Sequence, residues 1–260
     1  MNSIVKNYNQ LVRKYREIEK ETSENEIHDK RVILRRIFPI ITVYKMNLTD
    51  VKNGEMAFRL FGKLRDVQVQ ILKLESMDQS PEFIDYLTFL KHKEVKLKVK
   101  TDRLSKKKEI EFPVLKNKSN PTTSKIEART RKSLNKLVEK EEAWRNDESA
   151  NIHEIRIAFK KFRYIVEVLS YQKETDEEKL VKLKYFQDKL GEIQDYELLI
   201  NGMKNYFKTK GKSITSSVGF FKDEQNELIE AFDKEVESLI AVCRELIPQN
   251  SKAKKDVNEI

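Results

Sequence analysis

The chain has 260 residues, 38% of them hydrophobic and 37% charged, so it can bury a core beneath a heavily ionised surface. Only six glycines and five prolines are present, which leaves little room for the turns of an all-β protein and favours long helices. The formal net charge of +9 favours a polyanionic partner, such as a nucleic acid or a phosphate polymer.

Cysteine content and hydropathy indicate where the protein resides. The lone Cys243 excludes an intramolecular disulfide, and its apolar neighbours are typical of a core thiol. The first twenty residues lack the apolar stretch of a signal peptide. No apolar run approaches the roughly 18 residues needed to cross a bilayer. We therefore expect a cytoplasmic protein without a membrane-spanning segment.

Hydrophobic periodicity predicts eight amphipathic helices in two sets of four. The first set covers residues 4–21, 26–46, 52–77 and 81–107. The second set covers residues 124–144, 149–171, 175–209 and 218–247. Residues 94–100 alternate between apolar and polar side chains and could form a short strand. We assign them to a helix because residues 85–92 run into them without a turn residue.

The segment between the two sets has the composition of a connector. It contains two prolines, two asparagines and several hydroxyl residues, which favour extended structure over a helix. The predicted fold is therefore all-α, with two tandem four-helix bundles in one domain, residues 1–247. The first unit covers residues 1–108, the connector 109–123 and the second unit 124–247, and a polar tail follows at 248–260.

Two sequence motifs occur once in each set. The segment IHDKRVILRR, residues 27–36, returns as IHEIRIAFKK at residues 152–161. Residues 58–72 match residues 186–200 when Gly62 is laid on Gly191. Arg65 then lies opposite Gln194, and Asp66 lies opposite Asp195. The two alignments indicate an internal duplication.

On a helical wheel, each histidine segment places its apolar residues on one side and its cations on the other. Arg31 and Arg35 fall within about 60° of His28. In the second copy, the residues that share a face are His153, Arg156, Lys160 and Arg163. Like charges four residues apart destabilise a helix by a few tenths of a kcal/mol. Their clustering in both copies predicts an anion-binding site, and the alternative is a solvated basic face.

The doubled histidine motif, each copy followed by a helix of the pattern [Leu/Phe]-Gly-x-[Leu/Ile]-x-Asp, resembles the CHAD domain, the conserved-histidine α-helical domain. The resemblance implies two four-helix bundles related by pseudo-twofold symmetry. It also implies that inorganic polyphosphate binds through a basic groove or channel, which we expect the two His-x-x-Arg helices to line. Association with polyphosphate granules is a further expectation.

The resemblance assigns phosphate contacts in both repeats. In the first repeat these are His28, Arg31, Arg35, Arg36 and Arg65. In the second repeat they are His153, Arg156, Lys160 and Lys161, to which we add Arg163 from its place on the same helical face. Gln194 opposite Arg65 and Phe38 opposite Arg163 put strict equivalence of the two half-sites in doubt.

Two other functions remain as alternatives. Residues 91–118 contain eleven Lys or Arg against four Asp or Glu, and this basic stretch could lie along RNA. The pair His28 and Arg31 also resembles a histidine phosphotransfer domain. However, the bulky Val32 and Ile157 stand where a small residue normally follows the cation.

Nothing in the sequence indicates an enzyme. His153 and Glu154 begin like a zinc-protease motif, but Ile157 occupies the position of its second histidine. No glycine-rich phosphate loop or Ser-His-Asp pattern is present. With three histidines and one cysteine in the chain, we expect neither a metal site nor another cofactor.

Overall fold

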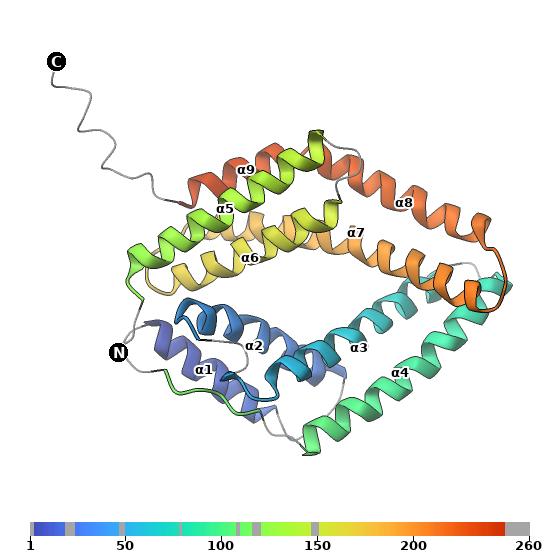
Figure 1. The fold of residues 1–260 in the computed structure, drawn as a ribbon, viewed down its shortest axis with the longest axis horizontal. Helices are drawn as coiled ribbons and strands as arrows, with labels where there is room; N and C mark the ends of the chain where they lie inside the picture. Colours follow the sequence, from blue (N-terminus) through green and yellow to red (C-terminus); the bar gives the residue numbers. More distant parts are fainter. Residues whose placement is uncertain are drawn as a thin grey trace. The chain divides into compact units, whose positions relative to one another are not determined.

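The computed structural model describes residues 3–18, 24–46, 50–77, 80–107, 110–115, 121–146 and 151–247. Within these ranges the protein is all-α, as predicted, and contains nine α-helices and no strand (Figure 1). An isolated β-bridge joins Lys52 to Glu111. No helix in the described ranges combines the length and the apolar character that crossing a membrane requires.

The helices are 10 to 33 residues long. In chain order they are α1 (Ser3–Glu17), α2 (Glu24–Val43), α3 (Gly54–Glu75), α4 (Pro81–Lys107), α5 (Thr123–Asn146), α6 (Ile152–Ser170), α7 (Glu177–Thr209), α8 (Thr215–Asp233) and α9 (Val236–Glu245). Residues 94–100, where the sequence alternates, are helical and lie within α4. Helix α2 continues through Pro39 to Val43.

The contacts divide the chain into two compact units that differ from the two sequence halves. Unit 1 contains residues 1–121 together with 188–234, and unit 2 contains residues 122–187 together with 235–260. Helix α7 is therefore shared, because the division falls between Gln187 and Asp188. Consequently the carboxyl-terminal part of α7 and the whole of α8 pack with helices of the first half.

In unit 1, α1 packs on α2, α2 on α3, and α3 on α4. The connector residues 110–115 also belong to this core. The Tyr8 hydroxyl of α1 donates to the carbonyl oxygen of Pro113 at 2.7 Å. The ring of Phe112 meets Tyr15 edge to face, with centroids 5.3 Å apart. Residues 110–115 of the connector thus form no helix and are held by side chains of the first helix.

The carboxyl-terminal part of α7 contacts α4 through hydrogen bonds and an ion pair. The Tyr206 hydroxyl donates to Asp85 at 2.8 Å, and the Lys210 ammonium group donates to both carboxylate oxygens at 2.8 Å. The buried Tyr86 hydroxyl donates to Gln70 of α3 at 2.8 Å. These contacts join α3, α4 and α7 within unit 1.

In unit 2, α5 packs on α6 and also touches α9. The Tyr185 hydroxyl of α7 donates to Glu235, which lies just before α9. Lys179 and Glu245 form an ion pair at 3.1 Å. The unit thus joins α5 and α6 to the first part of α7 and to α9.

The sequence predicted one helix over residues 218–247, whereas the structure has two. Helix α8 ends at Asp233 and α9 begins at Val236. No glycine or proline lies at the break, so no local signal predicts it. Phe232 and Val236 are both completely buried, but they belong to different units. The break between the two helices thus coincides with the boundary between the two units.

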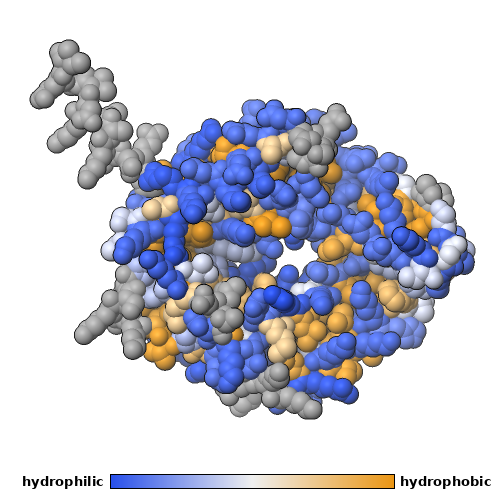
Figure 2. Space-filling model, in the orientation of Figure 1, coloured by the Kyte–Doolittle hydropathy of each residue, from blue (hydrophilic) through white to orange (hydrophobic). Residues whose placement is uncertain are grey.

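Charged residues dominate the surface. Hydrophilic residues cover most of the face of the molecule that Figure 2 shows, and hydrophobic residues appear between them in smaller areas. The core itself is rich in Leu, Ile, Val and Phe. Apolar side chains are therefore concentrated in the interior and hydrophilic ones at the surface.

Candidate anion-binding site

The histidine segment of α2 buries its apolar face and leaves most of its basic residues accessible. Its buried residues include Ile33, Leu34, Ile37, Ile40 and Ile41. His28 and Arg36 are exposed, and Arg31 and Arg35 are half-buried. The accessible basic face that the helical wheel predicts is therefore present in this helix.

One basic residue of the segment lies on the opposite side. The side chain of Lys30 is buried, with 1% of its surface exposed. Its counterpart in the second repeat is Ile155, which is also completely buried. The burial of Lys30 was not predicted from the sequence. Its alignment with an isoleucine in the second repeat was the available signal.

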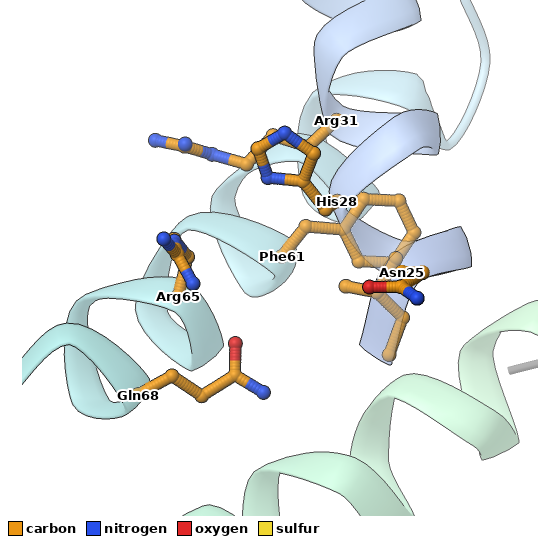
Figure 3. A pocket seen from close by; sticks show the side chains of 7 residues that line it. Asn25, His28, Arg31, Phe61, Arg65 and Gln68 are labelled. Atoms are coloured by element: carbon orange, nitrogen blue, oxygen red, sulfur yellow. The ribbon is translucent and has the colours of Figure 1, made fainter. Parts of the chain in front are cut away.

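A pocket of about 190 Å³ opens between α2 and α3 of unit 1. It is lined by Asn25, Ile27, His28, Arg31, Phe61, Arg65 and Gln68. Figure 3 shows Arg31 and His28 reaching its edge from α2 and Arg65 from α3. Three of the predicted phosphate contacts thus converge on one opening, and none of its lining residues is acidic.

Arg31 lies across the surface of α3 instead of extending into solvent. Its guanidinium carbon is 5.7 Å from the centroid of the Phe58 ring, which permits a cation–π contact. A Cβ atom placed on Gly62 would lie 3.8 Å from Nε and 3.9 Å from Nη2 of Arg31. These distances are ordinary van der Waals contacts, so the guanidinium group packs directly over Gly62.

Arg65 and His28 are available to a ligand. Neither has a hydrogen-bond or ion-pair partner among the described residues. The neighbouring Gln68 donates a hydrogen bond to Glu94 of α4 at 3.2 Å. Glu94 also forms an ion pair with Lys98 at 2.7 Å. The carboxylate that contacts the lining residue Gln68 is therefore already paired with a lysine.

The remaining predicted residues of the first repeat lie outside the pocket lining. Arg35 follows Arg31 by one helical turn, about 6 Å along the axis. Arg36, one residue further on, lies on a different side of the helix from Arg31 and Arg35. Four further residues line the pocket that were not among the predicted contacts, namely Asn25, Ile27, Phe61 and Gln68. For Asn25, Phe61 and Gln68 the available signal was spacing, because each lies three or four residues from His28 or Arg65.

In the second repeat, α6 begins with a side-chain cap. Asn151 accepts a hydrogen bond from the backbone N–H of His153 at 2.8 Å. His153, Arg156 and Lys160 are half-buried, and Lys161 is exposed. The basic face predicted for this helix is therefore only partly accessible.

Two charged side chains of α6 have partners on neighbouring helices. Lys140 of α5 pairs with Glu154 at 2.6 Å, and this hydrogen bond holds the pKa of the Glu154 carboxyl below its ordinary value. Arg163 donates to the side-chain oxygen of Gln187 on α7. A predicted phosphate contact, Arg163, thus has an intramolecular acceptor.

Further along α7, Gln194 occupies the position that corresponds to Arg65. Its side chain is buried and donates to Glu197 at 2.9 Å. Glu197 in turn corresponds to Gln68 when Gly62 is laid on Gly191. At these two positions the first repeat has an arginine and a glutamine, whereas the second repeat has a glutamine and a glutamate.

The described residues offer little for covalent or metal chemistry. Among them, no three His, Cys, Asp or Glu side chains are grouped so that they could hold a metal ion. Cys243 is completely buried, and burial raises the pKa of its thiol far above the ordinary value. This cysteine therefore behaves as a core residue.

Comparisons with known proteins agree with the resemblance in the sequence. The chain matches the family model of the CHAD domain over residues 6–201. A crystal structure of the CHAD domain from the plant Ricinus communis has a similar fold, with a TM-score of 0.59 and 14% sequence identity. That alignment covers 95% of this chain and 91% of the plant chain. No match was found among curated proteins.

Proposed function

The chain belongs to the CHAD domain family, and on that premise we propose that it binds inorganic polyphosphate through the basic faces of α2 and α6. The proposal is binding without catalysis and without a cofactor. It places the protein in the cytoplasm, in association with polyphosphate granules. The pocket that His28, Arg31 and Arg65 line is the observation that carries the proposal.

The chemistry of the pocket suits a phosphate group. Arginine donates several N–H groups in a fixed geometry that matches phosphate oxygens, and such charge-assisted hydrogen bonds are among the strongest in proteins. His28 adds another nitrogen at the rim. The surrounding Phe61 and Ile27 lower the local polarity, which strengthens these interactions.

A phosphate polymer also suits the rest of the basic surface. Polyphosphate has no bases to be read, so binding needs only cations that follow a flexible chain of charges. Each phosphate that an arginine or a lysine neutralises releases counterions, and affinity therefore falls as the salt concentration rises. Arg35, Arg36, Lys160 and Lys161 extend the basic faces beyond the first contacts.

The proposal includes a basic groove that α2 and α6 line together. A polymer long enough to reach both helices would gain affinity through effective concentration, whereas a short one would not. Loss of the cations of α6 should then reduce the affinity for long polyphosphate by more than it reduces the affinity for tripolyphosphate. Equal losses for both ligands would argue against a shared groove.

The deciding experiment is a titration with long-chain polyphosphate across a range of salt concentrations. The test variant replaces Arg31, Arg35, Arg156 and Lys160 by Ala. We expect a loss of several orders of magnitude in affinity and a decrease of roughly 3 in the slope of log affinity against log salt. Helicity measured by circular dichroism should stay constant or rise slightly, because like-charge neighbours are removed and Ala favours helices.

A matched control variant removes four cations from α4, namely Lys93, Lys96, Lys100 and Arg103. These four side chains are exposed and have no carboxylate partner among the described residues. We expect this variant to lose less than a tenth of the binding free energy that the test variant loses. If both variants lose affinity equally, binding depends on diffuse charge and the histidine motif has another purpose.

RNA is the second candidate ligand, and the same part of α4 is the observation that favours it. Lys96, Lys100 and Arg103 follow one another at intervals of about one helical turn on an exposed face. A competition titration with polyphosphate and RNA at equal phosphate concentration distinguishes the candidates. Preference for RNA that is lost in the α4 variant would support the second function.

A further inference from the structure

The residues that line the first-repeat pocket have different counterparts in the second repeat. Arg31 corresponds to Arg156 and His28 to His153, so these two are matched. Arg65 corresponds to Gln194, however, and Gln68 corresponds to Glu197. With histidine neutral, the first set has two positive charges, from Arg31 and Arg65, whereas the second set has one arginine and a glutamate in place of a glutamine.

The side chains on α7 reinforce this difference in charge. Gln194 is buried and already donates to Glu197, so it is not presented to a ligand as Arg65 is. The cation that α6 has in addition to those of α2, Arg163 opposite Phe38, donates to Gln187. The extra cation therefore does not make up for the missing one.

The two glycines of the repeat also differ in what they accommodate. Gly62 lies beneath the Arg31 guanidinium, with its Cβ position 3.8 Å from Nε. The Cβ position of Gly191 has no other atom within 4 Å. A Cβ atom at Gly62 would thus make an ordinary van der Waals contact with Arg31, and only a side chain longer than that of Ala would displace the guanidinium group, whereas no such contact exists at Gly191.

We propose that the two half-sites are unequal and that the pocket of His28, Arg31 and Arg65 is the single anchoring site for a short phosphate chain. Helix α6 supplies a weaker contact that contributes when the polymer is long enough to extend beyond the pocket. This inference rests on the proposed function. It predicts that one tripolyphosphate binds per chain at low concentration, and that affinity then rises with polymer length.

The first test is a calorimetric titration with tripolyphosphate at low salt. We expect one ligand per chain. Replacing Arg31 by Ala should weaken binding about tenfold or more, because a charge-assisted hydrogen bond is lost. Replacing the matched Arg156 by Ala should weaken it less than about threefold, in the range of an exposed, screened pair. Two equal sites per chain, or equal losses for both variants, would overturn the inference.

A second test transfers the residues of the second repeat into the first. The double variant Arg65→Gln with Gln68→Glu should lose tripolyphosphate binding at the anchoring site, because a cation is removed and a carboxylate is introduced. Its affinity for long-chain polyphosphate should fall as well, although contacts to α6 would remain. Unchanged tripolyphosphate affinity in this double variant would contradict the assignment of the anchor.

A third test uses the two glycines and has a readout that needs no ligand. In Gly62→Leu the new side chain occupies the place of the guanidinium group, so Arg31 should react faster with phenylglyoxal, as measured by mass spectrometry. Gly191→Leu adds the same bulk where the Cβ position is open, and the reactivity of Arg31 should not change. Tripolyphosphate affinity should fall about tenfold for the first variant only, by loss of the contact made by Arg31.

These results separate the inference from the function on which it rests. If long-chain polyphosphate fails to bind the unmodified protein at low salt, the proposed function is wrong. If it binds, but the Arg31 and Arg156 variants behave alike, only the inequality of the half-sites is wrong. The phenylglyoxal measurement stays informative in both cases, because it reports the position of Arg31 in the free protein.

Discussion

Arg163 of α6 donates a hydrogen bond to Gln187 of α7 at positions that correspond to Phe38 of α2 and Phe58 of α3. The two phenylalanine rings meet edge to face, with centroids 5.3 Å apart. The same pair of positions is therefore in contact in both repeats, although one pair is polar and the other aromatic. This agreement supports the internal duplication that the sequence predicts.

The first prediction concerns this polar pair. Arg163→Ala should lower the free energy of unfolding by about 1–2 kcal/mol, because a hydrogen bond with a charged donor is lost. The variant should bind tripolyphosphate with nearly unchanged affinity. Urea unfolding, combined with the Gln187→Ala and double variants, would measure the coupling between the two side chains. A coupling energy near zero would show that the hydrogen bond does not stabilise the fold.

The second prediction concerns the close approach of α7 to α4. A Cβ atom at Gly202 would lie 2.1 Å from the Tyr86 hydroxyl oxygen and 3.0 Å from Oε1 of Gln70. Because that tyrosine is buried and hydrogen-bonded, it cannot simply move aside. Gly202→Ala should therefore destabilise the protein by about 1–3 kcal/mol, measured as a lower midpoint of urea unfolding.

Gly219 of α8 is the matched control for this substitution. Its Cβ position has no other atom within 4 Å, and its backbone is helical. Gly219→Ala should therefore stabilise the protein by about 0.5–1 kcal/mol, as expected from helix propensity alone. A stabilising effect of Gly202→Ala as well would indicate that Tyr86 relaxes more easily than the structure implies.

The third prediction concerns the buried position shared by Lys30 and Ile155. Both side chains are completely or almost completely buried, so each repeat has adapted to a different chemistry at one site of the helix. Ile155→Lys should destabilise the protein by more than about 3 kcal/mol, because an ammonium group would be buried in an apolar environment. Thermal unfolding would detect a large decrease in Tm. A Tm close to that of the unmodified protein would mean that unit 2 already offers a polar partner there.

The fourth prediction concerns acid sensitivity. The hydrogen bond from Lys210, and next the one from Tyr206, lowers the pKa of Asp85 below its ordinary value of 3.8. A carboxyl group with a lowered folded-state pKa stabilises the fold above its unfolded value, and this contribution disappears as the pH falls through the folded value. The Tm of the unmodified protein should therefore fall below about pH 4 more steeply than that of Asp85→Asn.

Parallel Tm curves for these two proteins would show that Asp85 does not contribute to acid sensitivity. The comparison needs a variant that leaves neighbouring contacts intact. Asp85→Asn retains an acceptor for Tyr206 while it removes the charge that Lys210 contacts. A difference between the two curves that appears only at low pH therefore reports the titration of this carboxyl group.

The helical content and the basic face of α2 follow from the sequence alone. Both depend on the position of a side chain around its own helix axis, and that position is fixed by the 3.6-residue period. The alternating residues 94–100 were correctly assigned to a helix for a related reason, since no turn residue precedes them. The doubled histidine motif, finally, identified the family, because its spacing is specific and occurs twice in order.

Tertiary structure decided the features that depend on a neighbour from another helix. The convergence of Arg65 with Arg31 and the contribution of Gln68 require α3 to pack beside α2. Three further features depend on which side chains are buried together in each unit. They are the burial of Lys30, the packing of residues 188–234 with the first half, and the break between α8 and α9. Such contacts are set by shape and burial across the whole unit, and a period within one helix carries no information about them.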